Sequence, residues 1–172
     1  MKKIGFIVVL GLLLLGFDLP KSAQKKIDKT ITALWQDKVI TKTPVHLNTT
    51  QKTNFKINDK ELFYLKNNQQ LMGYLYLAKA NSRSDKIDFM VVFKPDLSIL
   101  TVQILVYREE YGGEVGSKRW LKQFNNKTNG KEMKFGYDVQ NISGATISAR
   151  SMTQAVNQIS KNIVVLKKQG VL

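Results

Sequence analysis

The chain has 172 residues, enough for one domain with a hydrophobic core. It contains no cysteine and a single histidine, His46, which excludes disulfides, a lipid-modified cysteine, a thiolate metal site and a metal site built from several histidines. The net charge of +14 comes from scattered lysines with no arginine-rich run, so we expect a solvated basic surface and no nucleic-acid partner.

The N-terminus carries an apolar run from Ile4 to Phe17, preceded by two lysines. This run is shorter than the roughly 20 residues that span a bilayer, and its length suits a signal-peptide core. Cleavage after Ala23 is one interpretation, and an uncleaved anchor is the other. We therefore expect residues 1–23 to be a signal peptide or an N-terminal membrane anchor. Residues 24–172 are expected to form a single extracytoplasmic domain, either periplasmic or anchored and facing the periplasm.

The first element expected in this domain is an amphipathic helix over residues 25–36. Residues 37–60 are polar and irregular, with a short helix possible near 50–54. The spacing of apolar residues then changes from that of a helix to the pattern of strands. Strands are expected over 61–66, 70–79, 87–93 and 99–107. Turn residues separate these strands, so the pattern predicts an antiparallel meander of about four strands.

After the strands, a glycine loop from Arg108 to Glu114 leads into a helix expected over residues 115–124. A polar loop over 125–136 follows. The last helix is expected over about 149–168, where apolar residues recur as an amphipathic stripe. The pattern as a whole predicts an α+β fold in which the antiparallel sheet packs against the helices at 115–124 and 149–168.

A run of small and hydroxyl-bearing residues precedes the last helix: Ser143-Gly144-Ala145-Thr146-Ile147-Ser148. Gly144 and Ala145 let a bulky group approach the backbone closely. The free N–H groups and the dipole of the following helix favour an anion such as a phosphate. A phosphate would be hydrogen-bonded to the nearby hydroxyls or esterified to one of them. Taken alone, however, such a run is more often only a capped helix start.

The order of strand, glycine loop, helix, Ser-Gly-Ala-Thr and helix resembles the FMN-binding domain family over roughly residues 60–165. That family includes flavin-carrying components of the sodium-translocating NADH:quinone reductase and of the Rnf electron-transport complex. In it, the threonine of Ser-Gly-Ala-Thr carries FMN through a phosphoester bond that a flavin transferase installs. The resemblance therefore implies FMN as the cofactor, Thr146 as the attachment residue and a flavin transferase as a partner during maturation.

The resemblance also implies a cofactor site around Thr146. Its members would be the rest of the motif and part of the glycine loop, which packs beside the flavin in the family: Ser143, Gly144, Ala145, Ile147, Ser148, Glu109, Tyr111, Gly112 and Gly113. These two segments are expected to meet in space. Tyr111 or Trp120 would be the aromatic side chain that stacks on the isoalloxazine ring, and for Trp120 we favour a place in the core.

The expected function is that of an electron carrier, with a membrane or periplasmic redox partner and no catalytic residue of its own. One departure keeps an alternative open. The family usually has an acidic residue three positions before the serine of Ser-Gly-Ala-Thr, where this chain has Gln140. Either Asp138 substitutes for it, or FMN binds without a covalent bond, or the domain is a flavin-free binding or assembly module. A serine hydrolase is disfavoured because neither Ser143 nor Ser148 lies in a Gly-x-Ser-x-Gly turn.

Overall fold

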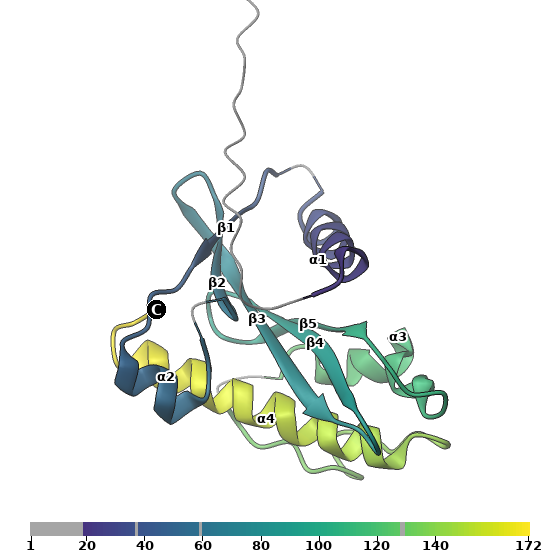
Figure 1. The fold of residues 1–172 in the computed structure, drawn as a ribbon. Coiled ribbons are helices and arrows are strands. Elements are labelled where there is room, and N and C mark those ends of the chain that lie inside the picture. Colours follow the sequence, from purple (N-terminus) through teal and green to yellow (C-terminus); the bar gives the residue numbers. More distant parts are fainter. Residues whose placement is uncertain (1–18, 37, 59, 128–129) are drawn as a thin grey trace, which may run out of the picture.

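The computed structural model describes residues 19–36, 38–58, 60–127 and 130–172. These residues form a five-stranded antiparallel sheet, in the order β1-β2-β3-β4-β5, with helices on both of its faces (Figure 1). The strands are β1 (Thr41–Pro44), β2 (Leu62–Asn67), β3 (Gln70–Asn81), β4 (Lys86–Phe93) and β5 (Ile99–Val106). The α+β class and the antiparallel meander expected from the sequence are confirmed.

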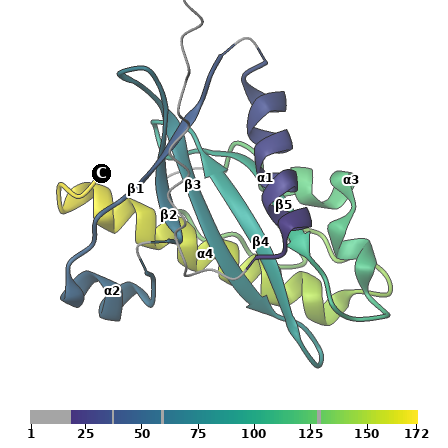
Figure 2. The ribbon, with the colours of Figure 1, turned by 45° about the horizontal axis from the view of Figure 1, so that its top comes forward.

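Four α-helices and two 3₁₀ turns complete the described part of the chain. They are α1 (Lys21–Leu34), α2 (Thr49–Phe55), η1 (Gly113–Gly116), α3 (Lys118–Leu121), η2 (Lys122–Phe124) and α4 (Thr146–Lys168). Helices α3 and α4 lie on one side of the sheet and α1 lies on the other, as the turned view makes clear (Figure 2).

The sheet separates two hydrophobic cores, and alternate residues of β3 serve one or the other. Tyr74 and Tyr76 belong to the larger core, which α4 and the segment around α3 complete. Leu75 and Leu77 belong to the smaller core under α1. Because both faces of the central strands are covered, β4 is buried from Ile87 to Phe93 and β3 from Gly73 to Leu77. In this central part of β3, the apolar side chains on both faces are therefore core positions.

Three elements differ from the sequence prediction. Strand β1 was not expected, because its residues are polar and lie at an exposed edge of the sheet, where no hydrophobic alternation is needed. The helix expected over 115–124 is broken into η1, α3 and η2, since Ser117 has extended backbone angles and caps α3. Helix α4 begins at Thr146 rather than near residue 149, so Thr146 is its first residue.

The N-terminal end of the described chain packs against the sheet. Helix α1 begins at Lys21, and Leu19 and Ala23 are both buried in the smaller core. Ala23, after which cleavage was considered, thus lies within the first turn of a packed helix. The apolar run over residues 4–17 lies outside the described residues. Among the helices that the structure describes, none combines the length and apolar content needed to cross a bilayer.

Candidate functional site

The start of α4 is an uncapped helix end. Gly144 occupies the left-handed region at φ +82°, and the chain then turns through Ala145 into the helix. No side chain caps the helix at Ala145, and the first N–H bonded back to this turn is that of Ala149. The N–H groups of the first turn are therefore left for a ligand, with the positive end of a 23-residue helix behind them.

The three hydroxyl groups of the motif have different surroundings. Thr146 is exposed, and its Oγ1 accepts a hydrogen bond from Asn141 Nδ2 at 3.1 Å. Ser148 is buried, with its hydroxyl 2.8 Å from Ser82 Oγ and 3.2 Å from Tyr107 Oη. Ser143 is exposed in the turn. Thr146 is thus the hydroxyl that is both held in place by a neighbour and open to solvent.

The glycine loop packs directly on this turn. Gly112 is at φ +80°, and a Cβ built there would lie 2.7 Å from Tyr107 Oη and 3.5 Å from the Gly144 carbonyl oxygen. Only glycine permits both the backbone angle and the close approach. Tyr107 Oη donates to the Tyr111 carbonyl at 2.7 Å, and this hydrogen bond holds the glycine loop against the end of β5. The loop and the motif, far apart in the sequence, therefore meet.

A cleft of about 310 Å³ lies between the two segments. Most of the residues expected around the flavin line it, and the loop between β3 and β4 adds one that was not expected. The lining residues are Arg83, Glu109, Tyr111, Gly112, Gly144, Ala145, Thr146, Ile147 and Ser148. Two expected members, Ser143 and Gly113, lie next to lining residues but outside this set. Arg83 gave no signal in the sequence, because only the tertiary fold brings its loop to the motif.

The Glu109 carboxylate joins the glycine loop to the loop between β3 and β4 by hydrogen bonds. Its Oε1 accepts hydrogen bonds from the backbone N–H of Ser84 at 2.7 Å and of Asp85 at 3.0 Å. The hydrogen bond from Ser84 N–H is the main cause that lowers the pKa of Glu109 below its ordinary value. Next to it, Arg108 forms an ion pair with the buried Asp88 and donates to the Lys86 carbonyl at 2.8 Å. The start of the glycine loop is thereby tied to β4.

The two aromatic residues considered for stacking on the isoalloxazine ring, Trp120 and Tyr111, differ in exposure. Trp120 is 3% exposed, donates from Nε1 to the Gln140 carbonyl at 2.8 Å and packs edge-on against Phe124, so it belongs to the core as expected. Tyr111 is 80% exposed at the cleft, and Ile147 across the cleft is 57% exposed. Large, mostly exposed side chains on both sides of a cleft suit a planar ring that would cover them.

The residues before the motif are engaged in local hydrogen bonds. The N–H of Gln140 donates to Gln123 Oε1 at 2.8 Å, and the Gln140 side chain donates to the Tyr137 carbonyl at 2.9 Å. Asp138 accepts from the N–H of Lys134 at 2.8 Å within its own turn. Neither Gln140 nor Asp138 lines the cleft. The carboxylate of Asp138 is thus used to close a turn and stands apart from the residues around Thr146.

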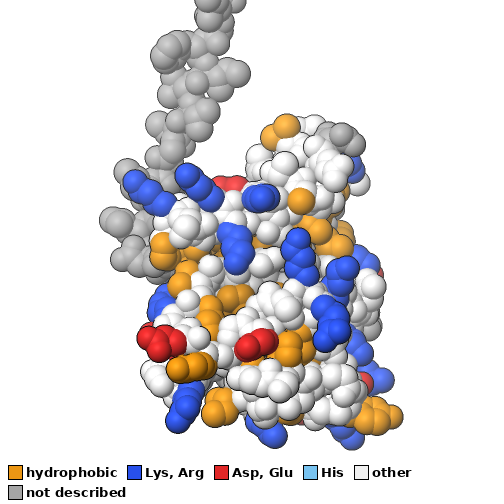
Figure 3. Space-filling view, turned by 90° about the vertical axis from the view of Figure 1, so that its right-hand side faces the viewer, with side chains coloured by type: hydrophobic (Ala, Val, Ile, Leu, Met, Phe, Trp, Pro, Cys, Tyr) orange, Lys and Arg blue, Asp and Glu red, His pale blue; other side chains and the backbone are white. Residues whose placement is uncertain are grey.

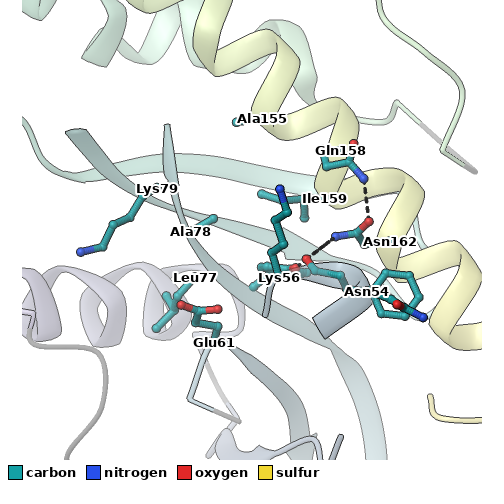
Figure 4. A pocket seen from close by; sticks show the side chains of 12 residues that line it. Asn54, Lys56, Glu61, Leu77, Ala78, Lys79, Ala155, Gln158, Ile159 and Asn162 are labelled. Carbon is teal, nitrogen blue, oxygen red and sulfur yellow. Dashed lines mark hydrogen bonds between the residues drawn. The ribbon is translucent and has the colours of Figure 1, made fainter. Parts of the chain in front are cut away.

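A larger cleft, of about 380 Å³, lies between the end of α2, β3 and α4 (Figure 4). Its polar groups bond to one another: the exposed Gln158 donates to the buried Asn162, and Asn162 donates to the Phe55 carbonyl and to Tyr76 Oη. Burial raises the pKa of Tyr76 to about 12, so this hydroxyl stays protonated near neutral pH. The polar groups of this cleft serve to join α2 and the sheet to α4.

The basic residues do not form one patch on the face that Figure 3 presents. Lys and Arg side chains are spread over it, with hydrophobic side chains and a few carboxylates between them. On this face, such a distribution gives a long-range attraction for anions.

The Thr146 cleft fits FMN in its chemistry. Two of its lining residues are glycines, a helix N-terminus and Arg83 suit the phosphate, and Tyr111 and Ile147 suit the ring. Comparison with known families gives the same result, since residues 83–161 match the model of the FMN-binding domain. The matched range includes every residue that lines the cleft. A search of curated proteins gave no matching relative.

Proposed function

We propose that this protein, whose residues 83–161 match the FMN-binding domain family and thereby support FMN as the cofactor, is a flavoprotein that carries FMN on Thr146 and transfers electrons. The observation that carries the proposal is the cleft at the start of α4. It combines an exposed threonine hydroxyl, an uncapped helix N-terminus and two glycines at which an added Cβ would meet neighbouring atoms within 3.5 Å.

Thr146 supplies the acceptor atom for covalent attachment. A flavin transferase would use a flavin dinucleotide as donor, since free FMN has no good leaving group. The bond from Thr146 Oγ1 to the FMN phosphorus forms, the pyrophosphate bond breaks, adenosine monophosphate leaves and the threonine proton passes to a base of the transferase. No oxidation or reduction occurs in this step. Asn141 holds the acceptor oxygen from one side and leaves the other open.

The described residues favour an electron carrier over an enzyme with its own substrate. FMN, when bound, supplies the redox chemistry, while the protein positions it and adjusts its potential. The cleft is lined by Arg83 and the cofactor candidates alone, and its rim, with Tyr111 and Ile147, is open to solvent. An exposed cofactor suits transfer to a protein partner. The N-terminal apolar run supports an extracytoplasmic location, with a membrane or periplasmic partner.

A denaturing gel viewed under ultraviolet light tests this function. The full chain is expressed together with a flavin transferase, purified and boiled in detergent. We expect a fluorescent band, because a phosphoester survives denaturation, and a solution absorbance that bleaches on chemical reduction. A yellow solution with a dark gel band would mean that FMN is held without a covalent bond.

The alternative function is a flavin-free binding or assembly module that keeps the fold. Gln140 favours it, because the family usually has a carboxylate at that position, and Asp138 is engaged in its own turn. A colourless protein after expression with an active transferase, with no flavin released on denaturation, would support the module and contradict the carrier.

A further inference from the structure

Arg83 is the one basic side chain among the described residues that line the Thr146 cleft. It comes from the loop between β3 and β4, which is fastened to the site on both sides of it. On one side, Ser82 Oγ lies 2.8 Å from Ser148 Oγ, in the first turn of α4. On the other side, Ser84 and Asp85 donate their N–H groups to Glu109. Arg83 is therefore held at the cleft by its neighbours.

The Ser148 hydroxyl contacts two neighbouring hydroxyl groups. Tyr107 has a single hydroxyl proton, and it goes to the Tyr111 carbonyl, which can only accept. Ser148 Oγ lies 3.2 Å from Tyr107 Oη and 2.8 Å from Ser82 Oγ, within hydrogen-bond distance of both. This chain of hydroxyls links the loop that carries Arg83 to the glycine loop through the start of α4. The three segments around the cleft form one hydrogen-bonded unit.

The guanidinium group of Arg83 has no hydrogen bond, ion pair or ring contact within the described part of the chain. The other charged lining residue, Glu109, uses Oε1 for the two backbone N–H groups. By contrast, Arg108 has its ion pair with Asp88, and Arg150 lies over the ring of Phe135. An arginine that is held at a cleft by its loop but lacks a partner is suited to pairing with an anionic ligand there.

We propose that Arg83 pairs with the phosphate of FMN attached at Thr146. The proposal rests on the function proposed above and adds a binding residue to it. The phosphodiester keeps one negative charge and two unesterified oxygens, which the planar fork of a guanidinium can bind together. The N–H groups at the start of α4 approach the same phosphate from the helix side. Arg83 thus acts as a binding and positioning residue and takes no part in bond making.

Phosphorus NMR of the loaded protein tests the pairing. The wild type and Arg83→Gln are each expressed with the transferase, and intact mass first establishes that FMN is attached. We expect the phosphodiester resonance of Arg83→Gln to shift away from that of the wild type, and Arg83→Lys to give an intermediate shift because it keeps the charge and loses the fork. Arg119→Gln, an exposed arginine outside the cleft, is the matched control and should superimpose on the wild type.

The possible failures are distinguishable. No attached flavin in the wild type would overturn the proposed function and this inference together. Attached flavin with the same phosphorus resonance in the wild type and Arg83→Gln would overturn the pairing alone. In that case, a lower midpoint potential in Arg83→Gln would place the guanidinium at the isoalloxazine ring, and an unchanged potential would remove Arg83 from the site.

Discussion

At the scale of single residues, the site depends on the absence of a side chain at two glycines. Gly112 and Gly144 both have left-handed backbone angles, at φ +80° and +82°. A Cβ at Gly112 would lie 2.7 Å from Tyr107 Oη and 3.5 Å from the Gly144 carbonyl oxygen, and one at Gly144 would lie 3.3 Å from the Glu114 carboxylate. The glycine loop and the motif therefore approach each other closely because neither glycine carries a side chain.

Gly112→Ala should lower the free energy of unfolding by about 1–3 kcal/mol, through left-handed backbone strain and the clash with Tyr107. Gly113→Ala is the matched control, because its added Cβ meets nothing within 4 Å. We expect no loss of stability in this control. Urea unfolding of the two variants and the wild type measures the difference. Equal stability of Gly112→Ala and Gly113→Ala would show that the close approach is absent in solution.

At the scale of elements, the site is an assembly of two loops and the turn that leads into α4. The loop between β3 and β4 is tied by Glu109 to the segment after β5, and Arg108 adds the ion pair with Asp88. These contacts join the loop between β3 and β4 to the segment after β5. Neither the strand pattern nor the motif predicts that these two segments meet. They explain why Arg83 reaches a cleft formed by residues far from it in the sequence.

The contribution of the Glu109 hydrogen bonds to the free energy of unfolding should depend on pH. Hydrogen bonds lower the pKa of this carboxylate from its ordinary value of 4.5, so its ionised form stabilises the folded state. That contribution is complete above about pH 4.5 and is lost as the pH falls through the lower folded-state pKa. Glu109→Gln should therefore lose less stability than the wild type on acidification. Unfolding free energies across this range measure it.

Glu110→Gln is the control for the pH experiment. Glu110 is exposed, and its carboxylate has no hydrogen bond within the described residues. Its acid profile should follow that of the wild type. If Glu109→Gln also follows the wild type, the hydrogen bonds to Ser84 and Asp85 do not persist in solution.

The sequence predicts elements where burial imposes a period. Strands β2 to β5 and helices α1 and α4 carry such periods, and they were predicted within a few residues. Strand β1 has no alternation of apolar and polar residues, because it lies at an exposed edge of the sheet. The motif and the glycine loop were predicted as one site through family resemblance. Arg83 was missed because a single loop arginine has no local pattern that distinguishes it from other surface charges.

At the scale of the whole molecule, the sheet is stabilised from both faces. The larger core holds α4 and the segment around α3, and the smaller core holds α1. Since the Thr146 cleft is built on α4 and the ends of β3 to β5, its rigidity depends on both cores. Leu19 and Ala23, at the start of α1, are part of the smaller one.

A chain that begins at Gln24 should be less stable than one that begins at Leu19. The shorter chain lacks two buried side chains and the first turn of α1, where Ala23 and Gln24 donate to the Pro20 carbonyl. The expected loss is about 1–3 kcal/mol from the removed apolar burial. Thermal or urea unfolding compares the two chains. Equal stability would mean that the domain needs nothing before Gln24 and that cleavage after Ala23 has no structural cost.

The most direct measurement is the intact mass of the full chain after expression with a flavin transferase. We expect the wild type to gain the mass of FMN less one water, and Thr146→Val, which keeps the shape and removes the hydroxyl, to gain nothing. Ser143→Ala removes the other exposed hydroxyl of the motif and should still carry the full added mass. An unmodified wild type beside an active transferase, or a Thr146→Val protein that still carries FMN through its phosphate, would contradict attachment at Thr146.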